Sequence, residues 1–186
     1  MNLDLTQGTK IIKTIRCLLR PLSLEDKRDI FDNINHNQEV LKYFLTAYYE
    51  HYEDFTLDSL FTRIASGLLC WAIVVDNTTI GFIIEQTHDE KARSIELGYA
   101  IGQPYWGKGY VPEALQAIQN YLYQECCFHK ISYSAIVDNT ASIRVMEKLG
   151  CTKEGICIDE IYYHDKFHDV VYYSKINPNE KKGGSL

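Results

Sequence analysis

Two glycines separated by one residue, Gly107 and Gly109, mark the segment of this chain whose chemistry is easiest to infer. They lie in residues 103–110, which follow a strand-like segment and lead directly into an amphipathic helix. Glycine lets the backbone approach another molecule closely, and the first N–H groups of a helix have no partner within it. Those groups and the helix dipole favour a bound anion, above all phosphate. The segment therefore predicts a phosphate-binding turn, although the same glycines could merely join a strand to a helix.

Two common phosphate-binding patterns fail in this segment at single positions. The P-loop pattern GxxxxGK[ST], started at Gly102, has Gly109 where a hydroxyl must hold magnesium. The dinucleotide pattern GxGxxG, started at Gly107, has Pro112 where the third glycine belongs. A nucleoside triphosphatase and a dehydrogenase are therefore disfavoured.

A third pattern fits, because two blocks of the sequence resemble the GNAT superfamily of N-acetyltransferases. Residues 96–101, 105–110 and 113–115 are similar to its acetyl-CoA-binding motif. Residues 139–142 and 147–150 are similar to the later helix that lies beside the CoA arm. The order of elements resembles the superfamily over nearly the whole chain, and most of all the branch of the ribosomal-protein N-terminal alanine acetyltransferases.

The resemblance implies acetyl-CoA as co-substrate, no metal, and a pyrophosphate held by backbone N–H groups of the glycine turn. One position departs from the superfamily, since Pro104 stands where Gln or Arg is usual and Gln103 lies one step earlier. This removes one expected polar contact and leaves the N–H groups intact. Nearby cations for the CoA phosphates would be Lys108, Arg144 and Lys148, unless the last two are only solvated. The residues expected to bind acetyl-CoA are Ile101, Gly107, Lys108, Gly109, Tyr110, Val111 and Asn139.

Acetyl transfer from a thioester to an amine also needs a base and a donor to the oxyanion. Glu96 lies on the strand and face where GNAT proteins often carry an acid, so we expect it to act as general base through a water molecule. It could instead be a surface or ion-paired glutamate. Backbone N–H groups near Ala100 or Ile101 would serve the oxyanion. A protein N-terminus, with a pKa of about 8, needs a weaker base than lysine, with a pKa of about 10.4.

The departing thiolate needs a hydrogen-bond donor, and many GNAT proteins supply a tyrosine from the later helix. The equivalent position here is Met146, which cannot donate a proton. The alanine acetyltransferase branch resembles this chain in having a serine, here Ser142, that can bond the CoA sulfur. Ser142 could instead serve the start of its helix. Asn139 could likewise be only a helix cap, although its amide could also bind the pantetheine chain.

Composition limits the other classes of protein to which the chain could belong. The chain has 186 residues, of which 46% are hydrophobic and 24% charged, as in an ordinary globular protein of one domain. Its formal charge of -6 argues against nucleic-acid binding and suits cationic acceptors. No apolar run approaches the roughly 20 residues needed to span a bilayer, and the start of the chain does not resemble a signal peptide. We therefore expect a cytoplasmic protein without membrane or nucleic-acid partners, either monomeric or homodimeric.

Metal sites are not favoured by the cysteines or histidines. Six cysteines show no CxxC spacing, and the vicinal pair Cys126 and Cys127 is expected to be buried or half-buried near a helix end. His164 and His168 have the i, i+4 spacing of a helical metal pair. Their neighbours are strand formers, however, so a hairpin is expected there.

Periodicity and turn residues predict the elements that position these groups. Pro21 ends the first strand, Ser23 caps the first helix, residues 76–77 turn a hairpin, and Gly150 ends the last helix. We expect strands at 14–19, 70–75, 79–85, 93–101, 130–137, 156–163 and 167–176, and helices from 24 through 31, within 54–66, at 109–126 and at 140–149. The helix from Gly109 carries one apolar stripe, formed by Val111, Ala114, Leu115, Ile118 and Leu122.

This order of elements predicts an α/β fold, with one mixed, mostly antiparallel twisted sheet and helices on both faces. The resemblance adds that the strands near Ile101 and Lys130 diverge to form a slot for the pantetheine arm. Residues 1–176 would form the acetyltransferase domain and residues 177–186 a flexible tail. The expected activity is acetylation of a primary amine, best a protein N-terminal α-amine. The alternatives are a small amine (polyamine, amino acid or aminoglycoside) and a non-catalytic CoA-binding regulator.

Overall fold

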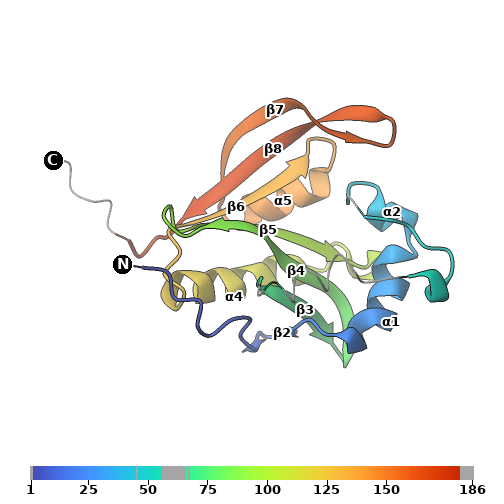
Figure 1. Cartoon of the computed structure of the whole chain (residues 1–186), viewed down its shortest axis with the longest axis horizontal. Helices are drawn as coiled ribbons and strands as arrows, with labels where there is room; N and C mark the ends of the chain where they lie inside the picture. The colour runs from blue at the N-terminus through green and yellow to red at the C-terminus, as the bar shows by residue number, and fades with distance from the viewer. Residues whose placement is uncertain (1, 45, 56–65, 67, 181–186) are drawn as a thin grey trace.

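A single mixed sheet forms the centre of the molecule (Figure 1). The computed structural model describes residues 2–44, 46–55, 66 and 68–180. Within them, eight strands follow the order β1-β2-β3-β4-β5-β6-β8-β7, and every neighbouring pair is antiparallel except β5 and β6. The strands are β1 (Ile12–Lys13), β2 (Leu18–Pro21), β3 (Cys70–Val75), β4 (Thr78–Asp89), β5 (Ser94–Ile101), β6 (Lys130–Ile136), β7 (Thr152–Tyr163) and β8 (Lys166–Ile176).

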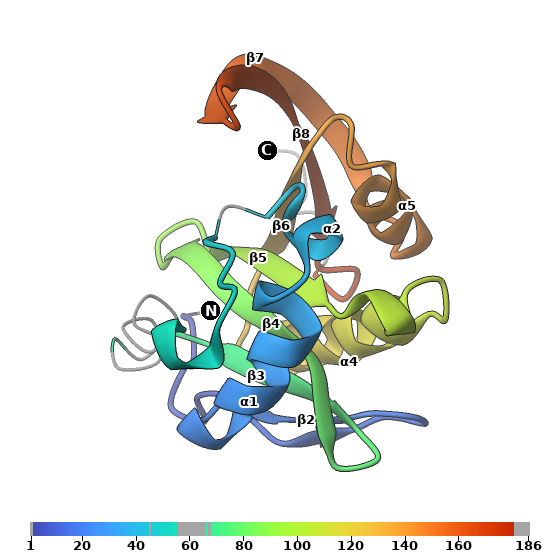
Figure 2. The ribbon, with the colours of Figure 1, turned by 90° about the vertical axis from the view of Figure 1, so that its right-hand side faces the viewer.

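Helices cover both faces of this sheet, which confirms the predicted fold class (Figure 2). On one face α4 (Tyr110–Gln124) and α5 (Thr140–Lys148) bury a core against side chains such as Trp71. On the other face α1 (Lys27–Ile30) and α2 (Gln38–Leu41) pack on a second core. Strand side chains alternate between the two faces, so the central strands β3, β4 and β5 contribute to both cores. The predicted stripe of α4 is buried at all five of its positions.

Several boundaries follow from local signals. Asp76 and Asn77, with φ of 49° and 62°, turn the β3–β4 hairpin as predicted, since a two-residue turn of this kind needs left-handed residues. Gly150, with φ of 72°, follows α5. Ser23 starts the first helical segment, and its N–H donates to the Asp26 carboxylate at 2.8 Å. That segment continues beyond α1 as a π-helical turn at Phe31–Asn35.

The start of the N-terminal strand is where the sequence prediction was wrong. Residues 14–17 of the expected strand at 14–19 form a turn between β1 and β2, closed by a hydrogen bond of 2.9 Å from the Thr14 N–H to the Cys17 carbonyl, and only Leu18 and Leu19 belong to a strand, β2, which ends at Pro21 as predicted. The physical cause of the turn lies on α4, where the Glu113 carboxylate accepts hydrogen bonds from Thr14 and Arg16. The predicted helix at 54–66 lies almost wholly outside the described residues.

The strands β5 and β6 separate after a short parallel contact, as predicted. Their register covers only three pairs, from Ser94 with Lys130 to Glu96 with Ser132. Beyond that point β5 stays paired with β4, while β6 stays paired with β8. This separation of the two backbones, here called the slot, widens toward the end of β5.

The C-terminal hairpin of β7 and β8 is also as predicted, and His164 lies in its turn. The described chain continues past Ile176. Asn177 is buried and its amide donates to the carbonyl oxygens of Tyr123 and Phe128. Glu180 accepts hydrogen bonds from Arg93. Residues 177–180 therefore pack on the domain, and the rest of the predicted tail lies outside the described residues.

Candidate functional site

The glycine turn lies at the end of β5 and opens into α4. A single 3-10 turn, Gln103–Tyr105, leads to Gly107 and Gly109, with φ of 72° and 83°. Both values are left-handed, which only glycine adopts at little cost. Gly107 and Lys108 are exposed, and Gly109 immediately precedes the first helical residue, Tyr110. The turn therefore presents its backbone to solvent at the positive end of a 15-residue helix, as an anion site requires.

Arg16 holds this turn in place, and the sequence analysis missed it. Its guanidinium donates to the Lys108 carbonyl at 2.7 Å and to Glu113 at 2.7 Å, and it lies over the Tyr110 ring at 4.6 Å. Hydrogen bonding to Glu113 raises the pKa of Arg16, so the group stays charged. No local pattern signals this contact, because 97 residues separate Arg16 from Glu113.

The edge of β5 that faces the slot carries a row of backbone groups. The Gly102 N–H bonds the Ile80 carbonyl, which places that N–H toward β4. Backbone groups alternate between the two edges of a strand, so the N–H groups of Tyr99 and Ile101, which lie beyond the last pair with β6, face the slot. Of the two residues expected near the oxyanion, Ile101 therefore has the suitable orientation and Ala100 faces β4.

The start of α5 lies across the slot from β5. The Asn139 side chain accepts the Ser142 N–H at 3.1 Å, so Asn139 caps this helix. The Ser142 hydroxyl does not take that capping role. Its Oγ lies 2.7 Å from the Tyr99 hydroxyl, which is also 3.3 Å from the Ser142 carbonyl oxygen. This contact joins β5 to α5 over the slot, and the sequence analysis did not anticipate it.

Tyr99 is the best-defined titratable group at the slot. Burial raises its pKa to about 12, and the hydrogen bond with Ser142 only partly offsets that effect. Its ring packs edge-on against Tyr133 of β6, with ring centroids 6.5 Å apart. The Tyr133 hydroxyl is itself satisfied by the Gln119 amide at 2.9 Å. Tyr99 is therefore a neutral hydroxyl in a fixed position throughout the ordinary pH range.

Glu96 lies at the point where β5 and β6 separate. Its carboxylate accepts the Ser134 hydroxyl of β6 at 2.6 Å, and the residue is half-buried. Along β5, Glu96 and Ala100 face the α1 and α2 side, whereas Leu97 and Tyr99 face the α4 and α5 side. The predicted base and the predicted thiolate donor, Ser142, are therefore on opposite faces of the sheet, with the slot between them.

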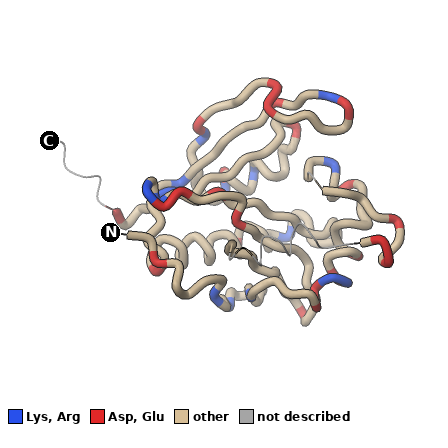
Figure 3. The backbone as a smooth tube through the Cα atoms, in the orientation of Figure 1, with Lys and Arg blue, Asp and Glu red and all other residues tan. Residues whose placement is uncertain are grey.

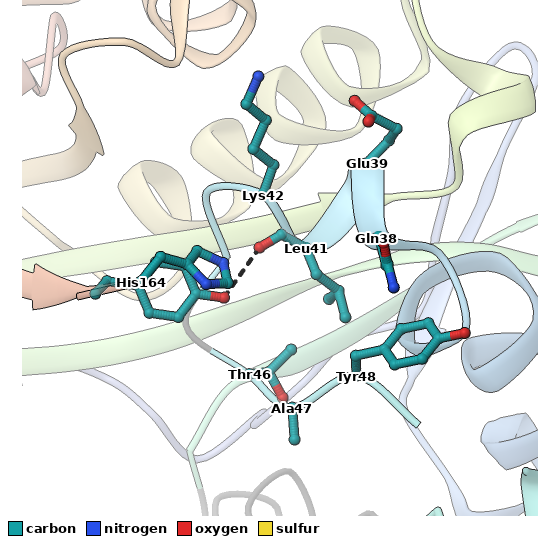
Figure 4. Close-up of a pocket in the computed structure, with 9 residues that line it drawn as sticks. Gln38, Glu39, Leu41, Lys42, Thr46, Ala47, Tyr48 and His164 are labelled. Atoms are coloured by element: carbon teal, nitrogen blue, oxygen red, sulfur yellow. Dashed lines mark hydrogen bonds between the residues drawn. The ribbon is translucent and has the colours of Figure 1, made fainter. Parts of the chain in front are cut away.

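A cavity of about 610 Å³ lies on the Glu96 face, between the α2 segment and the tip of the β7–β8 hairpin (Figure 4). Its wall is tied together by the Tyr163 hydroxyl, which donates to the carbonyl oxygens of Leu41 and Phe44 at 3.2 Å each. Figure 1 places α2 and this hairpin tip at the end toward which β5 runs. The lining residues are Gln38, Glu39, Leu41, Lys42, Thr46, Ala47, Tyr48, Tyr163 and His164.

Other predicted groups are positioned as follows. Met146 is fully buried in the core beneath α5, so its side chain faces away from solvent. Lys108, Arg144 and Lys148 are exposed. Cys126 is buried and Cys127 half-buried, as expected.

Three further observations concern charge, metal ligands and membrane-spanning helices. Acidic and basic residues are interspersed along the backbone (Figure 3). In the part of the chain that the structure describes, no three His, Cys, Asp or Glu side chains cluster closely enough to hold a metal. Within those same residues no helix has the length and apolar character needed to cross a membrane.

Comparison with known proteins agrees with this arrangement. The family described as the acetyltransferase (GNAT) domain matches residues 16–152. The chain is 28% identical to the uncharacterised N-acetyltransferase YoaA of Bacillus subtilis over 178 residues, which cover 91% of this chain and 98% of YoaA. It is 31% identical over 102 residues to YdaF of the same organism, provisionally named a ribosomal N-acetyltransferase. That match covers 55% of this chain and spans about half of the relative, 56%.

Solved structures share the fold. A GNAT-family acetyltransferase from Bacillus anthracis has a TM-score of 0.78 at 26% identity, covering 90% of this chain and 99% of its own. Spermidine N-acetyltransferase from Vibrio cholerae, in complex with CoA and spermine, has a TM-score of 0.75 at 22% identity, covering 87% and 96%. Ribosomal-protein-S5-alanine acetyltransferase from Vibrio fischeri has 0.77 at 19%, covering 92% and 99%. With the domain match over most of its length, the chain belongs to the GNAT family of acetyltransferases and is an acetyltransferase enzyme.

Proposed function

We propose that this enzyme transfers the acetyl group of acetyl-CoA to an α-amine at the N-terminus of a protein or peptide. The pyrophosphate would bind the N–H groups at Gly107, Lys108, Gly109, Tyr110 and Val111. The pantetheine arm would enter the slot and bond the β5 edge at Ile101, with Asn139 on the opposite side. The left-handed glycines and the open edge of β5 fit such a ligand, because both offer backbone donors without side chains in the way.

The opposite faces of the sheet give the two reactants separate approaches. On the α4 and α5 face, Ser142 donates a hydrogen bond to the thioester sulfur. On the α1 and α2 face, Glu96 accepts a proton from the amine, through water. Holding the thioester at the slot brings the reacting atoms into attacking geometry, which can contribute several orders of magnitude in effective concentration.

The lining of the cavity on the Glu96 face is the observation that carries the choice of acceptor. It contains one carboxylate, Glu39, and one lysine, Lys42. The other lining groups are the Gln38 amide, the His164 imidazole, the hydroxyls of Thr46, Tyr48 and Tyr163, and the apolar side chains of Leu41 and Ala47. A peptide backbone, with its own donors and acceptors, matches such a balanced polar lining. An extended polycation would need several carboxylates instead. An α-amine also requires a weaker base than a lysine side chain, because its pKa is lower.

A small cationic amine is the second candidate, and one contact favours it. The Tyr172 hydroxyl on β8 donates to Glu160 at 3.3 Å. Burial, followed by the negative charges of Glu160 and Glu96, raises the pKa of Tyr172. The carboxylates of Glu160 and Glu96 therefore lie near the same region of the sheet. Recognition of a second positive charge on a polyamine acceptor would require such a pair. The spermidine acetyltransferase of similar fold, and the chain's charge of -6, are consistent with this acceptor.

A thiol-release assay tests the proposal. The enzyme and acetyl-CoA are incubated with N-terminal peptides that begin with Ala, Ser or Met, and separately with spermidine, free amino acids and an aminoglycoside. We expect free CoA with peptides, and no CoA once the peptide N-terminus is blocked by acetylation. Release with spermidine alone would assign the second candidate. Binding of acetyl-CoA without release from any amine would favour a CoA-binding regulator.

The remaining features of the proposal concern the whole protein. Residues 1–176 form one catalytic domain, which acts in the cytoplasm as a monomer or homodimer without nucleic acid, membrane or metal. The turn at the hairpin tip, rather than a metal, accounts for the spacing of His164 and His168, because the His168 ring bonds the Tyr163 carbonyl at 3.0 Å.

A further inference from the structure

The contact between Tyr99 and Ser142 has a direction that chemistry can assign. Each hydroxyl can donate one hydrogen and accept others. A phenol is more acidic than an aliphatic alcohol, and the 2.7 Å contact with Ser142 Oγ is shorter than the 3.3 Å contact with the Ser142 carbonyl oxygen. The single Tyr99 hydrogen is therefore assigned to Ser142 Oγ. When Tyr99 donates to Ser142 Oγ, the Ser142 hydrogen is left for a third group. Chains of hydrogen bonds also strengthen each other in a buried setting.

The surroundings keep this chain of hydroxyls fixed. Tyr99 is held by its own strand and by the edge-on contact with Tyr133. Ser142 is held by the Asn139 cap at the first turn of α5. The two elements face each other over the widening slot, where the pantetheine arm is proposed to lie. The Ser142 hydrogen is therefore positioned for an acceptor in the slot.

We propose that Tyr99 is a positioning residue for acetyl transfer, because its hydroxyl donates to Ser142 Oγ and directs the Ser142 hydrogen to the thioester sulfur of acetyl-CoA. This proposal rests on the proposed function and deepens its account of thiolate departure. Many GNAT proteins have a tyrosine at the position equivalent to Met146 that donates to the departing thiolate. Here two residues on different elements, Tyr99 and Ser142, would share that role. Met146 is then free to fill the core.

The reaction balances with these roles. The amine nitrogen forms a bond to the acetyl carbon, and the carbonyl electron pair moves onto oxygen. When that pair returns, the carbon–sulfur bond breaks and its electrons stay on sulfur, where the Ser142 hydrogen bond stabilises the negative charge. The amine loses one proton on the Glu96 side, and the thiolate takes one from water, giving an amide and CoA thiol. Tyr99 remains protonated throughout.

Steady-state kinetics test this role through a double-mutant cycle. Tyr99→Phe should lower kcat about 3- to 10-fold, as expected for one hydrogen bond, and leave the KM for acetyl-CoA unchanged. In a Ser142→Ala background, Tyr99→Phe should have no further effect on kcat. The matched control is Tyr123→Phe, which removes another buried hydroxyl, bonded to the Lys175 carbonyl at 2.7 Å, and should leave kcat within two-fold.

Each other outcome of the cycle has a distinct meaning. If Ser142→Ala lowers kcat and Tyr99→Phe does not, the role of Tyr99 is refuted and the proposed function stands. If Tyr99→Phe costs the same in both backgrounds, Tyr99 only ties α5 to β5 through the Ser142 carbonyl, and the proposal is wrong. Because Tyr99 stays neutral, the alkaline limb of the pH profile should survive Tyr99→Phe. Loss of that limb would make Tyr99 the titrating acid and would also overturn a positioning role.

A binding measurement tests the same geometry without turnover. Calorimetry compares CoA with desulfo-CoA, which lacks the sulfur. The wild type should prefer CoA, and both Tyr99→Phe and Ser142→Ala should reduce that preference, whereas Tyr123→Phe should keep it. An equal preference in Tyr99→Phe and the wild type would contradict the proposal, even for a protein that acetylated none of the amines tested.

Discussion

Replacing Gly109 by alanine should weaken acetyl-CoA binding through the backbone rather than through a clash. The glycine has φ of 83° and ψ of 10°, and an added Cβ would lie 3.4 Å from the Arg16 guanidinium, which is ordinary contact. A left-handed conformation costs a residue with a side chain about 1–2 kcal/mol. The exposed turn should relax away from this conformation when free, and binding must restore it. The dissociation constant of acetyl-CoA should then rise about 5- to 30-fold.

Gly8→Ala provides the matched control for this measurement. Gly8 is also left-handed, with φ of 57°, and no atom lies within 4 Å of an added Cβ. Its carbonyl bonds Tyr121, eleven residues along α4 from the turn, or roughly 16 Å at 1.5 Å per residue. Isothermal calorimetry should therefore show wild-type affinity for Gly8→Ala. If Gly109→Ala also binds acetyl-CoA within two-fold of the wild type, the turn does not hold the pyrophosphate.

Three further substitutions test other contacts. Glu96→Gln should flatten the acidic limb of the kcat/KM profile, and an unchanged limb would assign the proton to another base or to bulk water. Arg16→Ala should raise the acetyl-CoA dissociation constant by up to about 5-fold, because the Lys108 carbonyl loses the guanidinium that holds the turn, and calorimetry measures it. Asp26→Asn should destabilise the fold by about 2–3 kcal/mol, measured by urea unfolding at pH 7. Burial opposes ionisation of Asp26, but hydrogen bonds, first from Arg20, outweigh the effect of burial and lower the pKa of Asp26. The stabilisation by the Asp26 carboxylate should therefore be complete above about pH 4 and vanish on further acidification.

The elements predicted correctly are those whose signals are local. The Asp76–Asn77 turn, the stripe of α4 and Gly150 each depend on residues within one short segment of the chain. The error at residues 14–17 has the opposite origin. Thr14 and Arg16 have strand-compatible neighbours, but Glu113 draws them into a turn from a distant helix. A propensity pattern contains no information about such a partner.

The candidate site divides in the same way. The phosphate-binding turn at Gly107 and Gly109 was predicted because its left-handed backbone requires glycine, which is visible in the sequence. Tyr99 was missed although it lies inside the motif that identified the family. Its partner, Ser142, is 43 residues away, and the meaning of the pair depends on the divergence of β5 from β6. A side-chain contact between β5 and α5 can be identified only when the positions of both elements are known.

The two faces of the sheet constrain how protons move in the reaction. Glu96 and Ser142 are separated by the plane of β5, so the proton taken from the amine cannot pass directly to the serine. Nor can Tyr99 supply it, because a phenol with a pKa of about 12 is a far weaker acid than a thiol with a pKa of about 8.5. The hydroxyl pair must therefore stabilise the leaving thiolate by hydrogen bonding, while solvent closes the proton balance. Ser142 and Tyr99 should therefore control the maximum rate in the pH profile. Glu96 and the acceptor amine should control its limbs.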